Sequence, residues 1–157
     1  ACHSDQALAL LDDANAQESA ILGDIRYTAN TAILHTDQTR LPRRSKAWAS
    51  WNYTLPTKQA SDQARLTYNM NILQHISTES QVLVTLNDPD IAQDKVIDQF
   101  EYAHPFYNAA MLKAQARHHE ISGRQRTHYC GAYWFYGFHE DGVKSALRVC
   151  NDLGVEW

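Results

Sequence analysis

The 157-residue chain contains only three cysteines and six glycines, and these scarcities exclude several classes of protein. An odd and sparse cysteine count fits reduced thiols better than a disulfide framework. No apolar run approaches the length of a membrane-spanning helix. The formal net charge of −4 lacks the basic excess of a nucleic-acid-binding domain. The composition therefore predicts a globular protein with no membrane span and no nucleic-acid partner.

The first residues also lack the basic and apolar regions of a secretory signal peptide, so we expect a cytoplasmic protein. The chain begins with Ala1 and Cys2 rather than with Met, and a helix signal follows at once. Ala1 and Cys2 are typical of the end of a strand whose beginning is missing. We therefore expect the chain to be a piece of a longer protein, with ordinary processing or removal of a tag as the alternative.

Helix and strand patterns alternate irregularly along the chain, and the strands gather in its middle. Helix patterns cover residues 5–13, 16–22 (closed by Gly23), 106–120 (begun by Pro105) and 143–150. Strand patterns cover residues 25–36, 47–53, 66–70, 82–86, 96–104 and 127–131. This order predicts an α+β fold with a mixed or antiparallel central sheet and helices on one face. With 44% hydrophobic residues and no visible linker, residues 1–157 are expected to form a single domain.

Two strand patterns are expected in the central sheet. Residues 47–53 place Trp51 and Tyr53 two positions apart, which is typical of a half-buried strand, and we expect Trp48 in the same strand. Residues 82–86 form a continuous apolar run that ends before Asn87-Asp88-Pro89. Most of the aromatic residues are expected in the core, because burial of aromatic rings dominates core energetics.

The most informative segment lies near the C-terminus, where three of the six glycines stand at 131, 137 and 142. It predicts a short strand, an aromatic loop and the start of an amphipathic helix. Glycine lets the backbone approach a flat ligand closely, and a helix N-terminus offers free N–H groups and positive partial charge. The segment therefore predicts a surface for a polarised, partly anionic ring. Its four consecutive aromatics, 133–136, cannot all point inward, so at least one should face a partner, a cavity or a ligand.

Two other groups of residues could be either functional or purely structural. His118, His119 and His139 lack the spacing of a metal-binding motif, and the first two diverge on a helix, so we expect no metal site. Cys130 lies near His128 and His139, but no third group orients a base, which favours a structural cysteine over a nucleophile.

A basic cluster, Pro42-Arg43-Arg44-Ser45-Lys46, is typical of a solvated surface. Contact with a phosphate or with an acidic partner is the functional alternative.

Several segments together carry a family resemblance that covers nearly the whole chain. They are residues 2–8, 34–37, 41–44, 48–53, 67–71, 84–87, 129–134 and 137–142. On these residues the chain resembles the C-terminal portion of the FAD-dependent amine-oxidase-like proteins, in particular the bacterial group described as predicted NAD/FAD-binding proteins. The segment at 129–142 is the specific one, and the others support it.

The resemblance implies a two-domain flavoprotein whose N-terminal Rossmann half holds the FAD pyrophosphate on a Gly-x-Gly-x-x-Gly loop. No such loop occurs in this sequence. What remains resembles the substrate domain followed by the final strand, loop and helix of the FAD domain, at about 127–157. The resemblance places the flavin beside Gly131, Ala132, Asp141, Gly142 and Val143. It places Tyr133 and Trp134 near the ring, where a small-molecule substrate binds.

The resemblance thus implies part of an FAD-dependent oxidoreductase that supplies the substrate cavity and one edge of the flavin site. We expect the parent protein to bind FAD, and this chain alone to bind it weakly or not at all. Surface that the missing half would cover is expected to favour self-association. The alternative is a stand-alone binding or interaction domain without catalysis.

Overall fold

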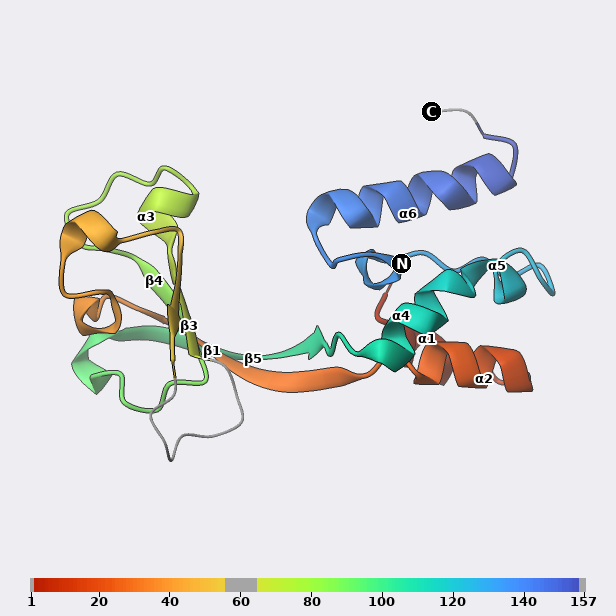
Figure 1. Cartoon of the computed structure of the whole chain (residues 1–157), viewed down its shortest axis with the longest axis horizontal. Coiled ribbons are helices and arrows are strands. Elements are labelled where there is room, and N and C mark those ends of the chain that lie inside the picture. Colours follow the sequence, from red (N-terminus) through yellow and green to blue (C-terminus); the bar gives the residue numbers. More distant parts are fainter. Residues whose placement is uncertain (1, 56–64, 156–157) are drawn as a thin grey trace. The chain divides into compact units, whose positions relative to one another are not determined.

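The computed structural model describes residues 2–55 and 65–155, and the chain divides into two compact units (Figure 1). Unit 1 comprises Ala1–Thr28 and His104–Trp157, and unit 2 comprises Ala29–Ala103. Two compact units can belong to one domain, so the single domain stays a prediction. Every helix in the described parts of the chain is too short or too polar to cross a bilayer.

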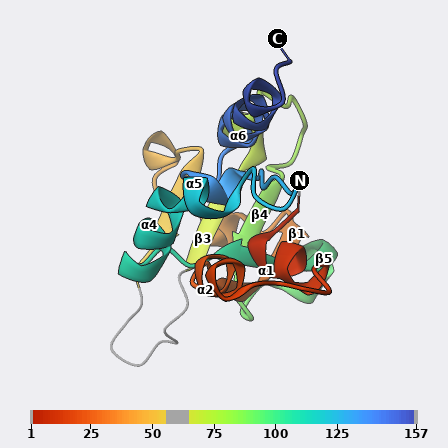
Figure 2. The same cartoon turned by 90° about the vertical axis from the view of Figure 1, so that its right-hand side faces the viewer.

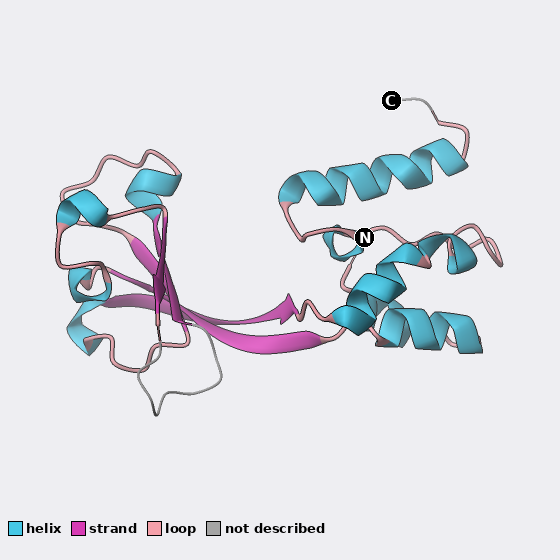
Figure 3. Cartoon of the chain, viewed as in Figure 1, coloured by secondary structure: helices cyan, strands magenta, loops and turns pink. Residues whose placement is uncertain are grey.

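Unit 2 is built on an antiparallel five-stranded sheet with the strand order β2-β3-β4-β1-β5 (Figure 3). The strands are β1 (Tyr27–His35), β2 (Trp51–Thr54), β3 (Arg65–Asn69), β4 (Leu83–Leu86) and β5 (Val96–Pro105). The first residues of β1 and the last of β5 belong to unit 1. The short helix α3 (Met70–Leu73) lies beside β3 and β4. The α+β class and the antiparallel sheet are therefore confirmed, whereas helices covering one face of the sheet stay a prediction.

The register gives the sheet a polar face and an apolar face. Asn52 pairs with Thr67, which pairs with Thr85, so one row of side chains across three strands is polar and buried. The neighbouring row on the other face pairs Trp51 with Tyr68 and Tyr68 with Val84. Trp51 is 52% exposed and Asn52 only 8%, so the aromatic side of β2 faces outward. The half-buried alternation predicted for this strand is confirmed at residues 51–53, and Trp51 and Tyr53 are not among the aromatic residues that lie in the core.

The prediction that Trp48 belongs to the same strand is also wrong. Trp48 follows a 3-10 turn (Ser45–Ala47), and its indole N–H donates to the Pro42 carbonyl at 2.8 Å. The side chain of Asn52 bonds both the N–H and the carbonyl of Ala49, at 3.1 and 2.7 Å. These bonds hold the chain in a turn, so β2 begins only at Trp51.

Unit 1 contains the remaining helices, which are labelled in Figure 2. They are α1 (Ser4–Ala9), α2 (Ala16–Gly23), α4 (Ala109–Ala116), α5 (His118–Ile121) and α6 (His139–Asp152). Their core consists of Ile21, Leu22, Ile25, Met111, Ala114, Ile121, Tyr129, Tyr133 and Trp134. The Tyr129 hydroxyl donates to the buried Glu18 carboxylate at 2.7 Å, which joins α2 to the segment before α6.

Three expected features of unit 1 differ from the structure. Pro105 ends β5 rather than opening a helix, because the Asn108 side chain caps α4 by accepting the Met111 N–H at 2.9 Å. Gly23 is the last residue of α2, and Asp24 caps that helix in a right-handed conformation. Residues 127–131 form no strand. The Gly131 N–H instead donates to Ser145 Oγ at 3.0 Å, so a side chain replaces the expected strand partner.

Candidate functional site

The expected flavin-edge residues come together in unit 1 where a 3-10 turn meets the start of α6. The turn spans Ala132–Trp134, directly after Gly131, and α6 packs against it. Gly142 lies in the first turn of α6, as the sequence predicts. A Cβ built on Gly142 would lie 4.0 Å from the Cβ of Ala132. The structure therefore brings Gly131, Ala132, Asp141 and Gly142 onto one small region, with the exposed Val143 beside them.

Asp141 has a capping role at this helix start. Its carboxylate oxygen Oδ2 accepts the N–H groups of Tyr136 at 3.2 Å and Phe138 at 3.1 Å. The side chain is buried, and a carboxylate at a helix N-terminus is stabilised by the positive end of the dipole. Local structure therefore explains Asp141, and its contact with a flavin stays a prediction.

The aromatic loop divides into buried and exposed members. Tyr133 and Trp134 are 4% and 3% exposed and belong to the core of unit 1, where the Trp134 ring meets His118 edge-on at 4.6 Å. Burial raises the pKa of Tyr133 and holds its hydroxyl protonated. Tyr136 and Phe138 are exposed, so the loop does direct aromatics outward, but not the two expected to line a substrate site. A substrate role for Tyr133 and Trp134 stays a prediction.

A second accessible aromatic surface lies on the sheet of unit 2, and we call it the aromatic face. It consists of Trp51, Tyr53, Leu66, Tyr68, Val84 and Leu86, which alternate with the buried polar residues. Trp51 meets Tyr68 edge-on with ring centroids 5.5 Å apart. Trp51 and Tyr53 are both more than half exposed. The period-2 pattern at 51–53 was the signal for this surface, but local sequence does not say which side of a strand faces outward.

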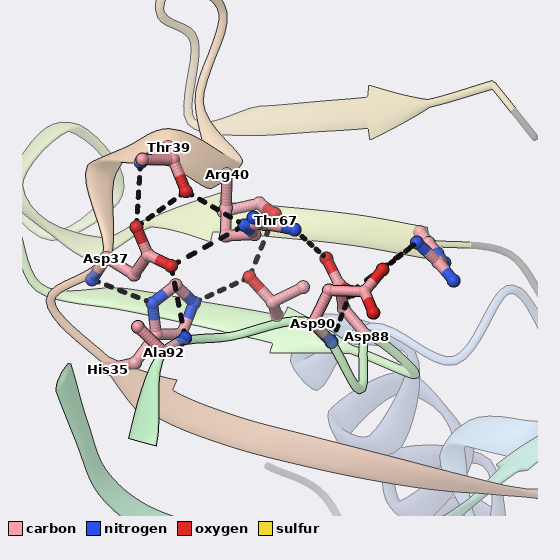
Figure 4. A network of polar contacts seen from close by, with 10 residues as sticks. His35, Asp37, Thr39, Arg40, Thr67, Asp88, Asp90 and Ala92 are labelled. Atoms are coloured by element: carbon pink, nitrogen blue, oxygen red, sulfur yellow. Dashed lines mark hydrogen bonds and ion pairs between the residues drawn. The ribbon is translucent and has the colours of Figure 1, made fainter. Parts of the chain in front are cut away.

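The opposite face of the sheet carries a buried hydrogen-bond chain centred on His35 (Figure 4). The Asp37 N–H donates to His35 Nδ1 at 3.0 Å, so the neutral ring carries its proton on Nε2. Nε2–H then donates to Thr85 Oγ1 at 2.7 Å, and Thr85 lies 2.9 Å from Thr67 Oγ1. Burial lowers the pKa of His35. Protonating Nδ1 would also break the bond from Asp37, so His35 is held neutral.

Asp37 ties this chain to the loop after β1. Its carboxylate accepts the N–H and hydroxyl of Thr39 at 3.0 and 2.7 Å and the Ala92 N–H at 3.3 Å. Burial alone raises the pKa of Asp37, but these hydrogen bonds and the charge of Arg40 outweigh it and hold the pKa below its ordinary value. Asp37 is therefore ionised and structural.

A network of arginine and aspartate side chains lies next to the His35–Asp37 hydrogen bonds, on the same face of the sheet (Figure 4). The buried Asp88 carboxylate lies 3.2 Å from Arg40 Nη1 and 3.5 Å from Arg65 Nη1. Arg65 Nη1 also lies 3.3 Å from Asp90. A pocket of about 380 Å³ opens beside them. Its lining is Thr39, Arg40, Leu41, Pro42, Arg43, Asn52, Tyr53, Thr54, Arg65 and Asp88.

The other sequence candidates stay dispersed. Across residues 2–55 and 65–155, no group of three His, Cys, Asp or Glu side chains could hold a metal ion. His118 is buried and bonds the Tyr129 carbonyl through Nε2 at 2.8 Å, whereas the adjacent His119 is exposed. The two histidines thus diverge, although the absence of a bound metal stays a prediction. The three cysteines are free thiols.

Comparison with known proteins adds no family to this description: neither a protein-family model nor a curated protein matches the chain.

Proposed function

We propose that the chain is part of an FAD-dependent oxidoreductase of the amine-oxidase-like class. In this proposal the region of Gly131, Ala132, Asp141, Gly142 and Val143 lies against one edge of the flavin. The motif at 129–142 supports the proposal at the level of sequence. The structure supports it as well, because the 3-10 turn at Ala132 and the first turn of α6 lie close together, as a shared flavin edge would require.

The observation that carries the proposal is Gly142. Glycine inside a helix costs about 1 kcal/mol relative to alanine. The structure offers no local reason for that cost, because a Cβ on Gly142 would meet only the Ala132 Cβ, at 4.0 Å, and Gly142 has no left-handed φ. A glycine that the fold does not need fits a position where a flat ring approaches the backbone.

The same region fits the charge of a flavin edge. The N-terminus of α6 carries positive partial charge, part of which the Asp141 carboxylate offsets, and a reduced flavin carries negative charge at its pyrimidine edge. When bound, the flavin would accept electrons from the substrate. The residues of this chain would hold the ring edge and orient it, with the Gly142 backbone as the point of closest approach.

The aromatic face of unit 2 supports the substrate side of the proposal. Trp51, Tyr53 and Tyr68 present large apolar rings that the described structure leaves accessible. Clefts that bind small molecules are lined mainly by apolar and aromatic side chains. We propose that this face, within unit 2, contacts the apolar part of a small-molecule ligand.

Gly142→Leu in the full-length protein is expected to remove most of the bound FAD or to shift its redox potential, because the side chain would enter the flavin edge. Gly142→Ala is the matched control and should retain more flavin. Flavin absorbance of the purified proteins, redox titration and turnover measure the difference. Both variants of the 157-residue chain should fold, because the space around this Cβ is open. Normal flavin content, potential and turnover in Gly142→Leu would show that Gly142 does not contact the flavin.

The aromatic face also favours a second candidate, a stand-alone binding domain without catalysis. Exposed aromatic surface is a common mark of interaction sites. Flavin content separates the two candidates: a purified full-length protein without flavin absorbance would favour the binding domain. Tight, stoichiometric FAD in the 157-residue chain alone would contradict the expectation that the phosphate-binding half is needed.

A further inference from the structure

The pocket beside Asp88 in unit 2 gathers several arginine side chains around one concave surface. Among its lining residues are three arginines and one aspartate. Asp88 lies between Arg40 and Arg65 and forms an ion pair with each of them. Asp88 therefore anchors Arg40 and the Nη1 atom of Arg65 before any ligand arrives, which reduces the entropy lost on binding. Such prearranged guanidinium groups suit an oxyanion.

Arg65 retains unused hydrogen-bonding capacity. Both of its ion pairs, with Asp88 and Asp90, use Nη1. Its Nε–H is buried and has no acceptor among the residues that the structure describes. Nε and Nη2 form the edge that grips a carboxylate, as Arg117 does with Glu120 at 2.9 Å and 2.9 Å. A small turn of the Arg65 guanidinium toward the pocket would present this edge to an incoming oxyanion.

Arg43 is the second group available to a ligand. It is exposed, lines the pocket and makes no ion pair with any described residue, whereas the adjacent Arg44 does not line the pocket. The basic cluster at 42–46 is therefore divided by the fold, and one of its arginines is turned to a concave surface. A basic cluster that was only a solvated surface would have no need to turn one arginine toward a pocket and its neighbour away from it.

The surrounding charges select the kind of oxyanion. Asp37, Asp88 and Asp90 offset the three arginines around the pocket, so the net local charge is close to zero. A singly charged carboxylate suits this balance better than a doubly charged phosphate, which would meet three nearby carboxylates. Pro42 adds apolar surface for the remainder of a ligand, and the volume of about 380 Å³ admits a small molecule.

We propose that this pocket binds the carboxylate group of a small organic acid, held by Arg65 and Arg43 and packed against Pro42. The proposal lies entirely within unit 2 and does not depend on the flavin. It identifies a binding site that the resemblance does not assign, formed by the loop after β1, the end of β2 and the start of β3.

Titration of the ¹⁵N-labelled 157-residue chain with sodium benzoate, followed by NMR, tests the proposal. We expect saturable shifts at the backbone amides of Thr39, Arg40, Tyr53 and Arg65. Benzamide has the same ring without the charge and should give no saturable shift, and inorganic phosphate should bind more weakly than benzoate. Equal binding of benzoate and benzamide, or no saturation with benzoate, would overturn the proposal. Tighter binding of phosphate would overturn its assignment to a carboxylate.

Three variants locate the site. Arg43→Gln should weaken benzoate binding by about tenfold through loss of a charged hydrogen bond, and its exposed side chain makes folding secure. Arg65→Lys should also weaken binding, because lysine keeps the charge but lacks the bidentate edge. Arg44→Gln is the matched control and should bind as the wild type does. An equal effect of Arg43→Gln and Arg44→Gln, or no effect of either pocket variant, would show that benzoate does not occupy this pocket.

Discussion

His35→Ala is expected to lower the free energy of unfolding by about 3–5 kcal/mol. The ring is fully buried, so its removal leaves a cavity beside β4. It also leaves the Asp37 N–H without its acceptor and the Thr85 hydroxyl without its donor. Buried polar groups that lose a partner retain their desolvation penalty, so the two losses add to the cavity term.

Urea unfolding followed by circular dichroism measures this change. His119→Ala is the control, because His119 is exposed and its replacement should alter stability by less than about 0.5 kcal/mol. A loss of less than about 1 kcal/mol in His35→Ala would show that the hydrogen-bond chain on the polar face is not central to the stability of the sheet.

The pH dependence of stability gives a second readout of the same residue. The folded-state pKa of His35 lies below its ordinary value of 6.5, mainly through burial, so the unfolded chain takes up this proton first. The contribution of His35 is therefore complete above that value and is lost as the pH falls toward the folded-state pKa. Asp37, whose pKa is also lowered, loses its contribution at still lower pH. Stability should fall on acidification from about pH 7 to pH 5, and less steeply in His35→Ala.

Gly131→Ala is expected to destabilise unit 1 by about 1–3 kcal/mol. A Cβ at this position would overlap the Tyr133 ring, with Cδ1 at 2.7 Å, and would lie 3.1 Å from the Cys2 carbonyl oxygen. Tyr133 is buried in the core and cannot swing into solvent, so the backbone or the core must shift. The close packing of this glycine is thus a structural need, in contrast to Gly142.

Gly23→Ala is the matched control, because no atom lies within 4 Å of the added Cβ. Gly23 ends α2, so alanine there should be neutral or should stabilise by up to about 1 kcal/mol. Thermal unfolding of both variants measures the contrast. Equal stability of Gly131→Ala and the wild type would show that Tyr133 can repack, and would restore a ligand as the main reason for Gly131.

The resemblance at 129–142 was an incomplete guide to the candidate site. It singled out a region that the structure does bring together, including the first turn of α6 around Gly142. It could not show that Asp141 caps the helix or that Tyr133 and Trp134 are core residues. Those roles depend on which groups surround each side chain, and neighbours distant in sequence supply many of them.

The sequence by itself determined the elements whose signals are local. Residues 25–36, 66–70, 82–86 and 96–104 each contain a strand because β-branched, aromatic or alternating apolar residues continue through several positions. The α+β class follows from their order. Errors occurred where one side chain overrides the pattern, as the Asn108 cap does after Pro105 and the Ser145 hydroxyl does at Gly131.

Only the tertiary structure decided which side of the sheet is polar and where the arginines meet. His35 and Thr85 are 50 positions apart and become partners through the register of β1 with β4. Arg40 and Arg65 share Asp88 because the ends of several strands converge beside one loop. Period 2 identifies the two faces of a strand but not the partner of either face. That choice depends on long-range pairing, which buries the polar row around His35 and leaves the aromatic face accessible.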